Sequence, residues 1–258
     1  MVTPSIQSLF ELSGHTAVVT GGSSGIGLAI AGFLADAGSQ VILVARREDR
    51  LKAAAAQIQA AGGKAGFVAA DLMDRDQLPD TVSRVKAVFS EPDILVNAAG
   101  VNLRQHADEV TPDGWDQTLH LNLSTPFFLA QALVPGMKAR GYGRIINIAS
   151  MQSLRAFANG IAYGASKGGI CQLTRAMAEA WSAQGITCNA IGPGFFPTEL
   201  TAPVFDDDDR RAWAANQTAI GRNGEMYDLA GVSVFLAAPA SGYITGQTIF
   251  VDGGFSAK

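Results

Sequence analysis

The residues best suited to chemistry are a tyrosine and a lysine four positions apart, Tyr163 and Lys167, with Ser150 upstream. At positions i and i+4 of a helix, the two side chains project from the same face. A tyrosine hydroxyl has an ordinary pKa of about 10, and a neighbouring ammonium stabilises the phenolate and lowers that pKa. The pair is therefore predicted to exchange a proton with a substrate oxygen near neutral pH, while the Ser150 hydroxyl holds that oxygen. Since many helices carry this spacing by chance, the elements around the pair decide its meaning.

A glycine-rich loop lies near the N-terminus, in the run Thr20-Gly21-Gly22-Ser23-Ser24-Gly25-Ile26-Gly27. An apolar run precedes it and a helical pattern follows it. Glycines at such a junction permit a tight turn and close approach to phosphate, and the helix N-terminus presents free N–H groups. We predict dinucleotide binding, although a merely tight turn would use the same glycines. The sequence has no Gly-x-x-x-x-Gly-Lys-Ser/Thr loop, so phosphoryl transfer from ATP has little support.

The end of the second apolar run, Val41–Ala45, bears on which dinucleotide binds. An acidic side chain there would bind the adenine ribose hydroxyls and repel a 2′-phosphate. The chain instead has Arg46 and Arg47, and a guanidinium suits phosphate through its planar fork of donors. We therefore predict NADP(H) rather than NAD(H). The alternative is that these arginines are solvated residues at a helix start, an explanation that fits Arg47 better than Arg46.

Length and composition limit the class of protein. The 258 residues are 48% hydrophobic and 16% charged, with a formal net charge of -4, which favours a compact soluble protein. The chain has no basic run for nucleic acid, no apolar stretch long enough for a bilayer, no secretory pattern at its N-terminus and no metal-ligand spacing. We expect a cytoplasmic protein in which Cys171 and Cys188 are reduced, with a disulfide as the alternative.

Short apolar runs alternate with longer helical patterns. Unbroken apolar strands are typical of parallel sheets covered on both faces, and the alternation predicts right-handed crossovers. We expect one α/β domain over residues 1–258, a single-domain Rossmann fold with a doubly wound, parallel seven-stranded sheet. The expected strands are 16–20, 41–45, 66–70, 94–97, 144–148, 187–191 and 248–251, and the expected helices are 25–37, 53–60, 77–89, 115–138, 163–183 and 229–237. Residues 194–224, here called the lid segment, break the alternation and are expected to cover the carboxyl end of the sheet.

These motifs together resemble the short-chain dehydrogenase/reductase family over nearly the whole chain. Thr20–Gly27 matches the family's Thr-Gly-x-x-x-Gly-x-Gly, Asn97–Gly100 its Asn-Asn/Ala-Ala-Gly element, and Val251–Gly254 its C-terminal signature. The resemblance implies a catalytic tetrad of Asn122, Ser150, Tyr163 and Lys167. The expected cofactor-binding residues are Gly21, Ser23, Ser24, Gly25, Ile26, Gly27, Arg46, Arg47, Asp71, Leu72, Asn97, Ala98, Ala99, Gly100, Tyr163, Lys167, Pro193, Gly194, Phe196 and Thr198.

The resemblance also implies a mechanism, hydride transfer between the B face of the nicotinamide C4 and a carbonyl carbon. Tyr163 would give or take the proton, Lys167 would lower its pKa and bind the nicotinamide ribose, and Ser150 would position the carbonyl oxygen. Asn122 would anchor a water that links Lys167 to solvent. Taken singly, several of these residues have plainer explanations: a serine after a strand is often a cap, Asn97 would link strands, and Asp71 would cap a helix.

The substrate side is expected to come from residues 102–106, residues 151–160 and the lid segment. Ordinary packing explains its aromatic residues as well as substrate contact does, and His106 and His120 are assigned to surface or packing roles. The expected apolar contacts are Met151, Leu154, Phe157, Phe195, Phe196 and Trp213, and the expected contacts to a polar or acidic group are Arg104, Gln152 and Arg155.

The amino-acid sequences of residues 194–200 and 246–254 most resemble those of gluconate 5-dehydrogenase-like members of the family. This implies a polyol or keto-sugar acid as the small-molecule substrate. A 3-oxoacyl-acyl carrier protein reductase, a broad ketone reductase and a non-catalytic NADP(H)-binding sensor stay open. The family further implies a homotetramer.

Overall fold

The computed structural model describes residues 5–258 and contains the predicted seven-stranded parallel sheet. The strand order is β3-β2-β1-β4-β5-β6-β7, so the order reverses between β1 and β4. Such a reversal opens a crevice at the carboxyl ends of the strands, where ligands bind in this class of fold. The strands are β1 (Thr16–Thr20), β2 (Gln40–Ala45), β3 (Lys64–Ala69), β4 (Ile94–Asn97), β5 (Gly143–Ile148), β6 (Ile186–Pro193) and β7 (Thr248–Val251).

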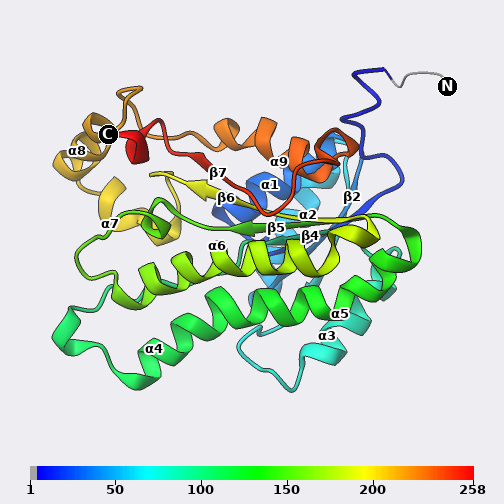
Figure 1. Cartoon of the computed structure of the whole chain (residues 1–258), viewed down its shortest axis with the longest axis horizontal. Coiled ribbons are helices and arrows are strands. Elements are labelled where there is room, and N and C mark those ends of the chain that lie inside the picture. The colour runs from blue at the N-terminus through cyan, green and yellow to red at the C-terminus, as the bar shows by residue number, and fades with distance from the viewer. Residues whose placement is uncertain (1–4) are drawn as a thin grey trace.

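Helices cover both faces of the sheet (Figure 1). One apolar core joins the sheet to α1, α2 and α9, and a second joins it to α3, α5 and α6. The doubly wound α/β fold is therefore confirmed. The helices are α1 (Gly25–Asp36), α2 (Glu48–Ala60), α3 (Leu78–Val88), α4 (Pro112–Leu119), α5 (Thr125–Arg140), α6 (Ile161–Trp181), α7 (Ala202–Phe205), α8 (Asp208–Gln217) and α9 (Ala230–Ala237).

The single long helix predicted over residues 115–138 is wrong in one respect. A π-helical turn, η2 (His120–Ser124), separates α4 from α5. Pro126 has no N–H to donate to the carbonyl of Asn122 four residues earlier, and a missing i→i−4 bond favours a local π turn. Apolar periodicity alone does not detect this change. The turn sets the direction in which Asn122 points.

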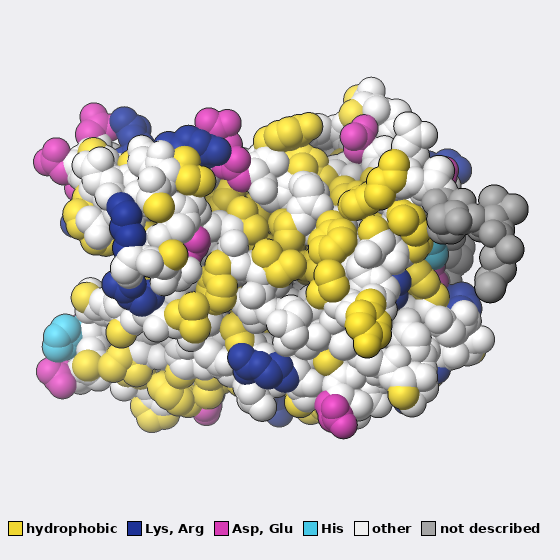
Figure 2. All heavy atoms as spheres, turned by 45° about the horizontal axis from the view of Figure 1, so that its top comes forward, with side chains coloured by type: hydrophobic (Ala, Val, Ile, Leu, Met, Phe, Trp, Pro, Cys, Tyr) yellow, Lys and Arg dark blue, Asp and Glu magenta, His cyan; other side chains and the backbone are white. Residues whose placement is uncertain are grey.

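The lid segment follows β6 and carries short helices, including η5 (Glu199–Thr201), α7 and α8. The acidic run 206–209 starts α8, where Asp207 caps the helix by accepting from Arg210 N at 3.0 Å. In Figure 2 the left-hand lobe carries charged side chains of both signs, and α7 and α8 lie at that end of the molecule in Figure 1. The two cysteines are buried and free, as expected.

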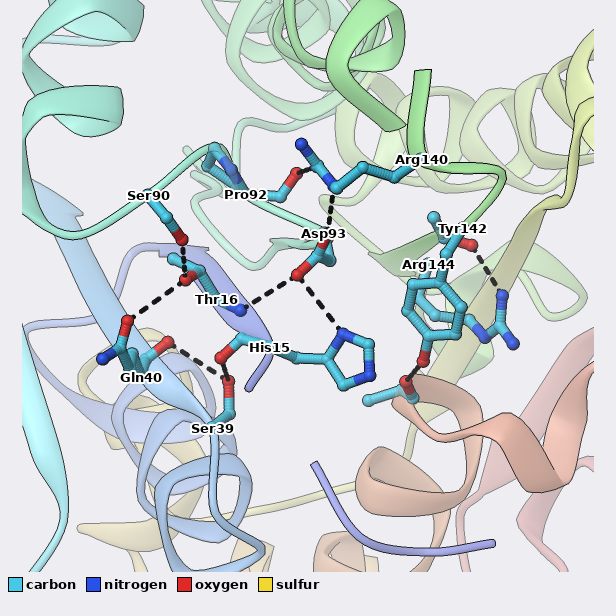
Figure 3. A network of polar contacts seen from close by, with 12 residues as sticks. His15, Thr16, Ser39, Gln40, Ser90, Pro92, Asp93, Arg140, Tyr142 and Arg144 are labelled. Carbon is cyan, nitrogen blue, oxygen red and sulfur yellow. Dashed lines mark hydrogen bonds and ion pairs between the residues drawn. The ribbon is translucent and has the colours of Figure 1, made fainter. Parts of the chain in front are cut away.

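A polar network joins the amino ends of the strands, opposite the crevice (Figure 3). Asp93 Oδ1 accepts from Arg140 Nε at 2.6 Å, and Asp93 Oδ2 lies 3.2 Å from His15 Nδ1. The His15 ring stacks on Tyr142 at 4.4 Å, and the guanidinium of Arg144 lies 4.1 Å from the centre of the same tyrosine ring. These contacts hold the sheet at the end away from the candidate site.

Among residues 5–258, none of the helices is long and apolar enough to cross a membrane.

Candidate active site

A cavity of about 540 Å³ lies at the carboxyl ends of the strands. Its walls include residues that directly follow β1, β2, β3, β4, β5 and β6, together with parts of α6 and the lid segment. Every residue predicted to bind the cofactor lines this cavity except Asn97. Every predicted catalytic residue lines it except Asn122. The predicted residues thus converge on one site, and the two asparagines stand behind its wall.

The glycine loop at the start of α1 leaves no room for side chains. A Cβ on Gly27 would lie 2.4 Å from Gly21 O, and a Cβ on Gly21 would lie 2.9 Å from Ala99 N. Gly21 and Gly25 also have φ values of 65° and 55°, which glycine tolerates best. The first turn of α1 has no acidic residue, and Ser24, its N-cap, makes no side-chain capping bond. This open cradle at a helix N-terminus fits a pyrophosphate.

Thr20 joins the glycine loop to the loop after β4. Its hydroxyl oxygen accepts from Ala98 N at 3.0 Å and from Ala99 N at 3.1 Å. The two loops that border the crevice are therefore fixed to each other. The sequence pattern included Thr20 without assigning it this contact.

Ser150, Tyr163 and Lys167 meet in the cavity although they come from two elements. Ser150 follows β5 and caps the short helix η3 (Met151–Ser153), with its Oγ accepting from Gln152 N at 3.1 Å. Tyr163 and Lys167 lie on α6, which is fixed to η3 because Ser153 Oγ donates to Lys167 O at 2.6 Å. All three side chains are at least nine-tenths buried. The arrangement suits general acid–base chemistry on one substrate oxygen.

The pKa of Tyr163 differs from the sequence-based prediction. Burial raises this pKa above 10.0, and the Ser150 hydroxyl and the positive charge of Arg104 lower it in part. The expected lowering by Lys167 does not appear, and the groups that lower this pKa are Ser150 and Arg104. Lys167 Nζ donates to Ile148 O at 2.6 Å and lies 5.6 Å from the centre of the Tyr163 ring.

Lys167 is itself strongly affected by burial. Desolvation lowers the pKa of its ammonium from 10.5 to about 8. The space beside it at position 100 is tight, since a Cβ there would lie 3.1 Å from Asn122 Oδ1 and 3.9 Å from Lys167 Nζ. The Lys167 ammonium therefore loses its proton as the pH rises through about 8.

Asn122 binds the loop after β4 rather than facing the cavity. Its Oδ1 accepts from Val101 N and its Nδ2 donates to Val101 O, both at 2.9 Å. Nδ2 also donates to Ser166 Oγ at 3.0 Å, and Ser166 donates to Tyr163 O at 2.7 Å. A chain of hydrogen bonds thus connects the β4 loop to the backbone of the tyrosine.

Asn97 has the plainer of its two predicted roles as its observed contact. Its Nδ2 donates to Asn147 Oδ1 at 2.9 Å, and Asn147 Nδ2 donates to Thr174 Oγ1 at 2.9 Å. These buried contacts link β4, β5 and α6 beneath the cavity. Asp71, by contrast, lines the cavity and also accepts from Met73 N at 3.0 Å in a local turn.

The substrate side differs in detail from the prediction. Arg104, Gln152, Phe157, Phe195 and Trp213 line the cavity, with Met151 and Phe196 beside them. Leu154 and Arg155 do not, and Arg155 instead donates to Lys258 O at 2.6 Å. His106 is exposed, and His120 accepts from Arg75 Nε at 2.9 Å away from the cavity.

Several wall residues, among them Asn159 and Glu199, were not named from the sequence because their signals are weak there. Asn159 has a φ of 58° and Arg104 a φ of 53°, and no other non-glycine residue in the described part of the chain has a positive φ. Such conformations in non-glycine residues often mark functional loops. Glu199 of the lid segment also lines the cavity and pairs with Arg47 at 3.1 Å. A single glutamate in a loop gives no pattern from which this contact follows.

Comparisons with known proteins agree with this geometry. A family model described as enoyl-(acyl carrier protein) reductase matches residues 21–256. Gluconate 5-dehydrogenase of Gluconobacter oxydans is 38% identical over 96% of this chain and 97% of that protein. 2-Dehydro-3-deoxy-D-gluconate 5-dehydrogenase of Escherichia coli is 39% identical over 98% of this chain and 100% of that protein.

Solved structures agree as well. A gluconate 5-dehydrogenase from Burkholderia cenocepacia in complex with NADP and tartrate has a TM-score of 0.94 and 37% identity, covering 98% of this chain and 100% of that one. A 3-oxoacyl-(acyl-carrier-protein) reductase from Agrobacterium tumefaciens with NADP bound has a TM-score of 0.91 and 32% identity, covering 96% and 97%. From its fold, its site and these relatives, the chain belongs to the short-chain dehydrogenase/reductase family of oxidoreductases.

Proposed function

We propose that this chain is an NADP(H)-dependent oxidoreductase that interconverts a secondary alcohol and a ketone on a polyol or sugar acid. The observation that carries the proposal is the convergence of Ser150, Tyr163 and the glycine cradle on one cavity. When bound, NADP(H) supplies or accepts the hydride. Relatives named for gluconate and 2-dehydro-3-deoxy-D-gluconate support the substrate class.

The chain's own residues account for the proton transfer. Tyr163 donates its proton to the carbonyl oxygen in reduction and accepts one in oxidation. Ser150 orients that oxygen by hydrogen bonding. Arg104 lies close enough to stabilise the phenolate form of Tyr163 by its charge. The buried Lys167 would donate hydrogen bonds to the hydroxyls of the cofactor ribose, and Asn122 keeps the β4 loop against α6.

The charge of the cavity supports the cofactor and the substrate class. Arg46 and Arg47 line it beside the glycine loop, where a 2′-phosphate would lie, and the solved relatives with bound NADP support the same choice. Arg104 lines the substrate side, so a carboxylate on the substrate would meet a guanidinium there. The lid segment, with Phe195 and Trp213, would exclude water from the reacting atoms.

A panel of cofactors and ketones tests this function. NADPH and NADH are each offered with 5-ketogluconate, a simple cyclic ketone and an acetoacetyl thioester, and the oxidation of the cofactor is followed by absorbance. We expect NADPH oxidation to be fastest with 5-ketogluconate. A preference for the thioester would instead support the 3-oxoacyl-acyl carrier protein reductase alternative, the name that one solved relative carries. No turnover with any ketone would support the non-catalytic sensor.

We further infer a cytoplasmic homotetramer. Strand β7 lies at the edge of the sheet and is only half-buried along its length, and Phe128 on α5 is 40% exposed. Figure 2 shows hydrophobic side chains gathered over the face that α9 and β7 form. Such faces are typical of contacts between identical subunits. Light scattering of the purified protein measures the assembly, and a monomer would contradict it.

A further inference from the structure

A cluster of ion pairs attaches the lid segment to the N-terminal end of α2, where the 2′-phosphate is predicted to bind. Glu199 Oε2 lies 3.1 Å from Arg47 Nη2, and Glu199 Oε1 pairs with Arg50 Nη1. Arg47 is the N-cap of α2 and lies next to Arg46, directly after β2. The Glu199 carboxylate of the lid segment is therefore paired with the guanidinium of Arg47, which lines the cofactor end of the cavity.

This contact joins two parts of the cavity wall that are far apart in the sequence. Arg47 and Glu199 both line the cavity, although they are 152 residues apart in the chain. On the other side of the lid, Arg104 Nη2 donates to Leu200 O at 2.8 Å. The turn η5 is thus held from two sides, by arginines of α2 and by an arginine of the loop after β4.

The two attachments differ in how easily they break. The side chains of Arg47, Arg50 and Glu199 are 45%, 45% and 57% exposed, so solvent screens their attraction. A phosphate near pH 7 carries a charge between -1.5 and -2, with three acceptor oxygens, and binds guanidinium more strongly than one exposed carboxylate does. Arg104 donates to a backbone carbonyl on the substrate side of the cavity, away from the predicted 2′-phosphate site, so binding of that phosphate leaves this contact in place.

We propose that Glu199 competes with the adenine-ribose 2′-phosphate of NADP(H) for Arg47, so that Arg47 exchanges partners on cofactor binding. The attachment of η5 to α2 is then weakened to the single pair between Glu199 and Arg50. The inference rests on the proposed NADP(H) site. It makes Glu199 a residue that reduces the preference for NADP(H) over NAD(H), and it couples the adenosine end of the cavity to the lid segment. NAD(H), which lacks the phosphate, leaves the pair intact.

Binding of adenine nucleotides without nicotinamide tests the exchange directly. Calorimetry measures Kd for adenosine 2′,5′-bisphosphate and for 5′-AMP at low ionic strength, on the wild type, Glu199→Gln and the control Asp209→Asn. The substitution Asp209→Asn removes the same charge from the lid segment, but Asp209 forms no ion pair with any residue from 5 to 258. We expect Glu199→Gln to bind the bisphosphate about threefold tighter, the difference typical of one exposed ion pair, with 5′-AMP unchanged and Asp209→Asn like the wild type.

Hydrogen exchange of residues 198–205 gives a second measurement that does not involve activity. In the wild type, adenosine 2′,5′-bisphosphate should speed exchange in this stretch and 5′-AMP should not, and in Glu199→Gln the stretch should exchange fast without ligand. Unchanged Kd in Glu199→Gln, or exchange that ignores the bisphosphate, overturns the inference alone if the wild type still prefers the bisphosphate to 5′-AMP. If the wild type has no such preference, the proposed NADP(H) site fails, and the inference fails with it.

Discussion

The side-chain amide of Asn122 forms two hydrogen bonds with the main chain of Val101, accepting from its N–H and donating to its C=O at 2.9 Å each. The loop that carries the substrate-side Arg104 starts from this contact. Because Asn122 also bonds Ser166, one buried amide fixes the β4 loop to the helix that presents Tyr163. Asn122 lies in a π turn, and Pro126, four residues later, has no N–H to donate to its carbonyl. We infer that this turn lets the Asn122 side chain contact both Val101 and Ser166.

Asn122→Leu should loosen that loop. The change leaves the Val101 N–H and C=O without partners, and an unsatisfied buried polar group costs about 1–3 kcal/mol. We expect the free energy of unfolding in urea to fall by about that amount, with faster hydrogen exchange in residues 100–106. Ser166→Ala removes only one of the three contacts, so a larger loss there than in Asn122→Leu would contradict the assignment.

Tyr163→Phe should stop turnover and leave the fold intact. The substitution removes the hydroxyl that exchanges the proton, and loss of general acid–base catalysis lowers the rate by about 10²–10⁴-fold. We expect kcat to fall by that factor, while calorimetry gives an NADP⁺ Kd within about twofold of the wild type because the ring remains. Substantial turnover by the variant would remove Tyr163 from its role.

Lys167 should make stability rise with pH above neutrality. Burial lowers the pKa of the folded ammonium from 10.5 to about 8, so between these values the unfolded chain binds more protons than the folded one. The penalty for burying the charge is then present below pH 8 and fades as the pH rises to about 10. Relative to Lys167→Met, the wild type should gain on the order of 2 kcal/mol in unfolding free energy from pH 8 to 10. A constant difference would contradict the lowered pKa.

Two glycines of α1 should respond to alanine in opposite ways. Gly27→Ala places a Cβ 2.4 Å from Gly21 O and must displace the cradle, whereas a Cβ on Gly32 meets nothing within 4 Å. We expect Gly27→Ala to lose NADP⁺ binding measured by calorimetry. Gly32→Ala should keep binding and raise the unfolding free energy by about 0.5–1 kcal/mol, since alanine favours a helix interior over glycine. Equal effects of the two substitutions would contradict the steric argument.

Asp93 should stabilise the fold in a pH-dependent way. Burial raises the pKa of its carboxyl, but hydrogen bonds from His15 and Thr16 and the charge of Arg140 outweigh burial and leave this pKa below 3.8. A lowered carboxyl pKa stabilises the folded state above the unfolded value and loses this effect as the pH falls through the folded value. Asp93→Asn should therefore lower the unfolding free energy at pH 7 by about 2 kcal/mol or more, since it breaks a mostly buried ion pair.

That deficit should shrink toward pH 3, as measured by urea unfolding at each pH. Asp80→Asn is the control, because its pair with Arg84 is 3.5 Å long and exposed. It should change the unfolding free energy by less than about 0.5 kcal/mol at any pH. A large loss in this control would mean that surface charge, rather than the buried network, explains the effect.

The sequence by itself determined the order of elements and the identity of most wall residues. Seven apolar runs separated by helical patterns leave few ways to bury both faces of a sheet, and the glycines of the 20–27 loop mark positions where only a missing side chain fits. Because parallel strands present their carboxyl ends at one edge, residues that follow different strands meet there. Ser150 and Tyr163 could thus be paired from sequence alone.

Only the tertiary structure decided where each polar atom points. The π turn at Asn122, the carbonyl of Ile148 that receives Lys167, and the contact of Glu199 with Arg47 each depend on groups distant in sequence. The shifted pKa of Tyr163 likewise follows from burial by the whole fold rather than from its spacing to Lys167. Spacing along one helix sets which side chains share a face, whereas hydrogen-bond direction and solvent exclusion are set by what the rest of the chain packs against that face.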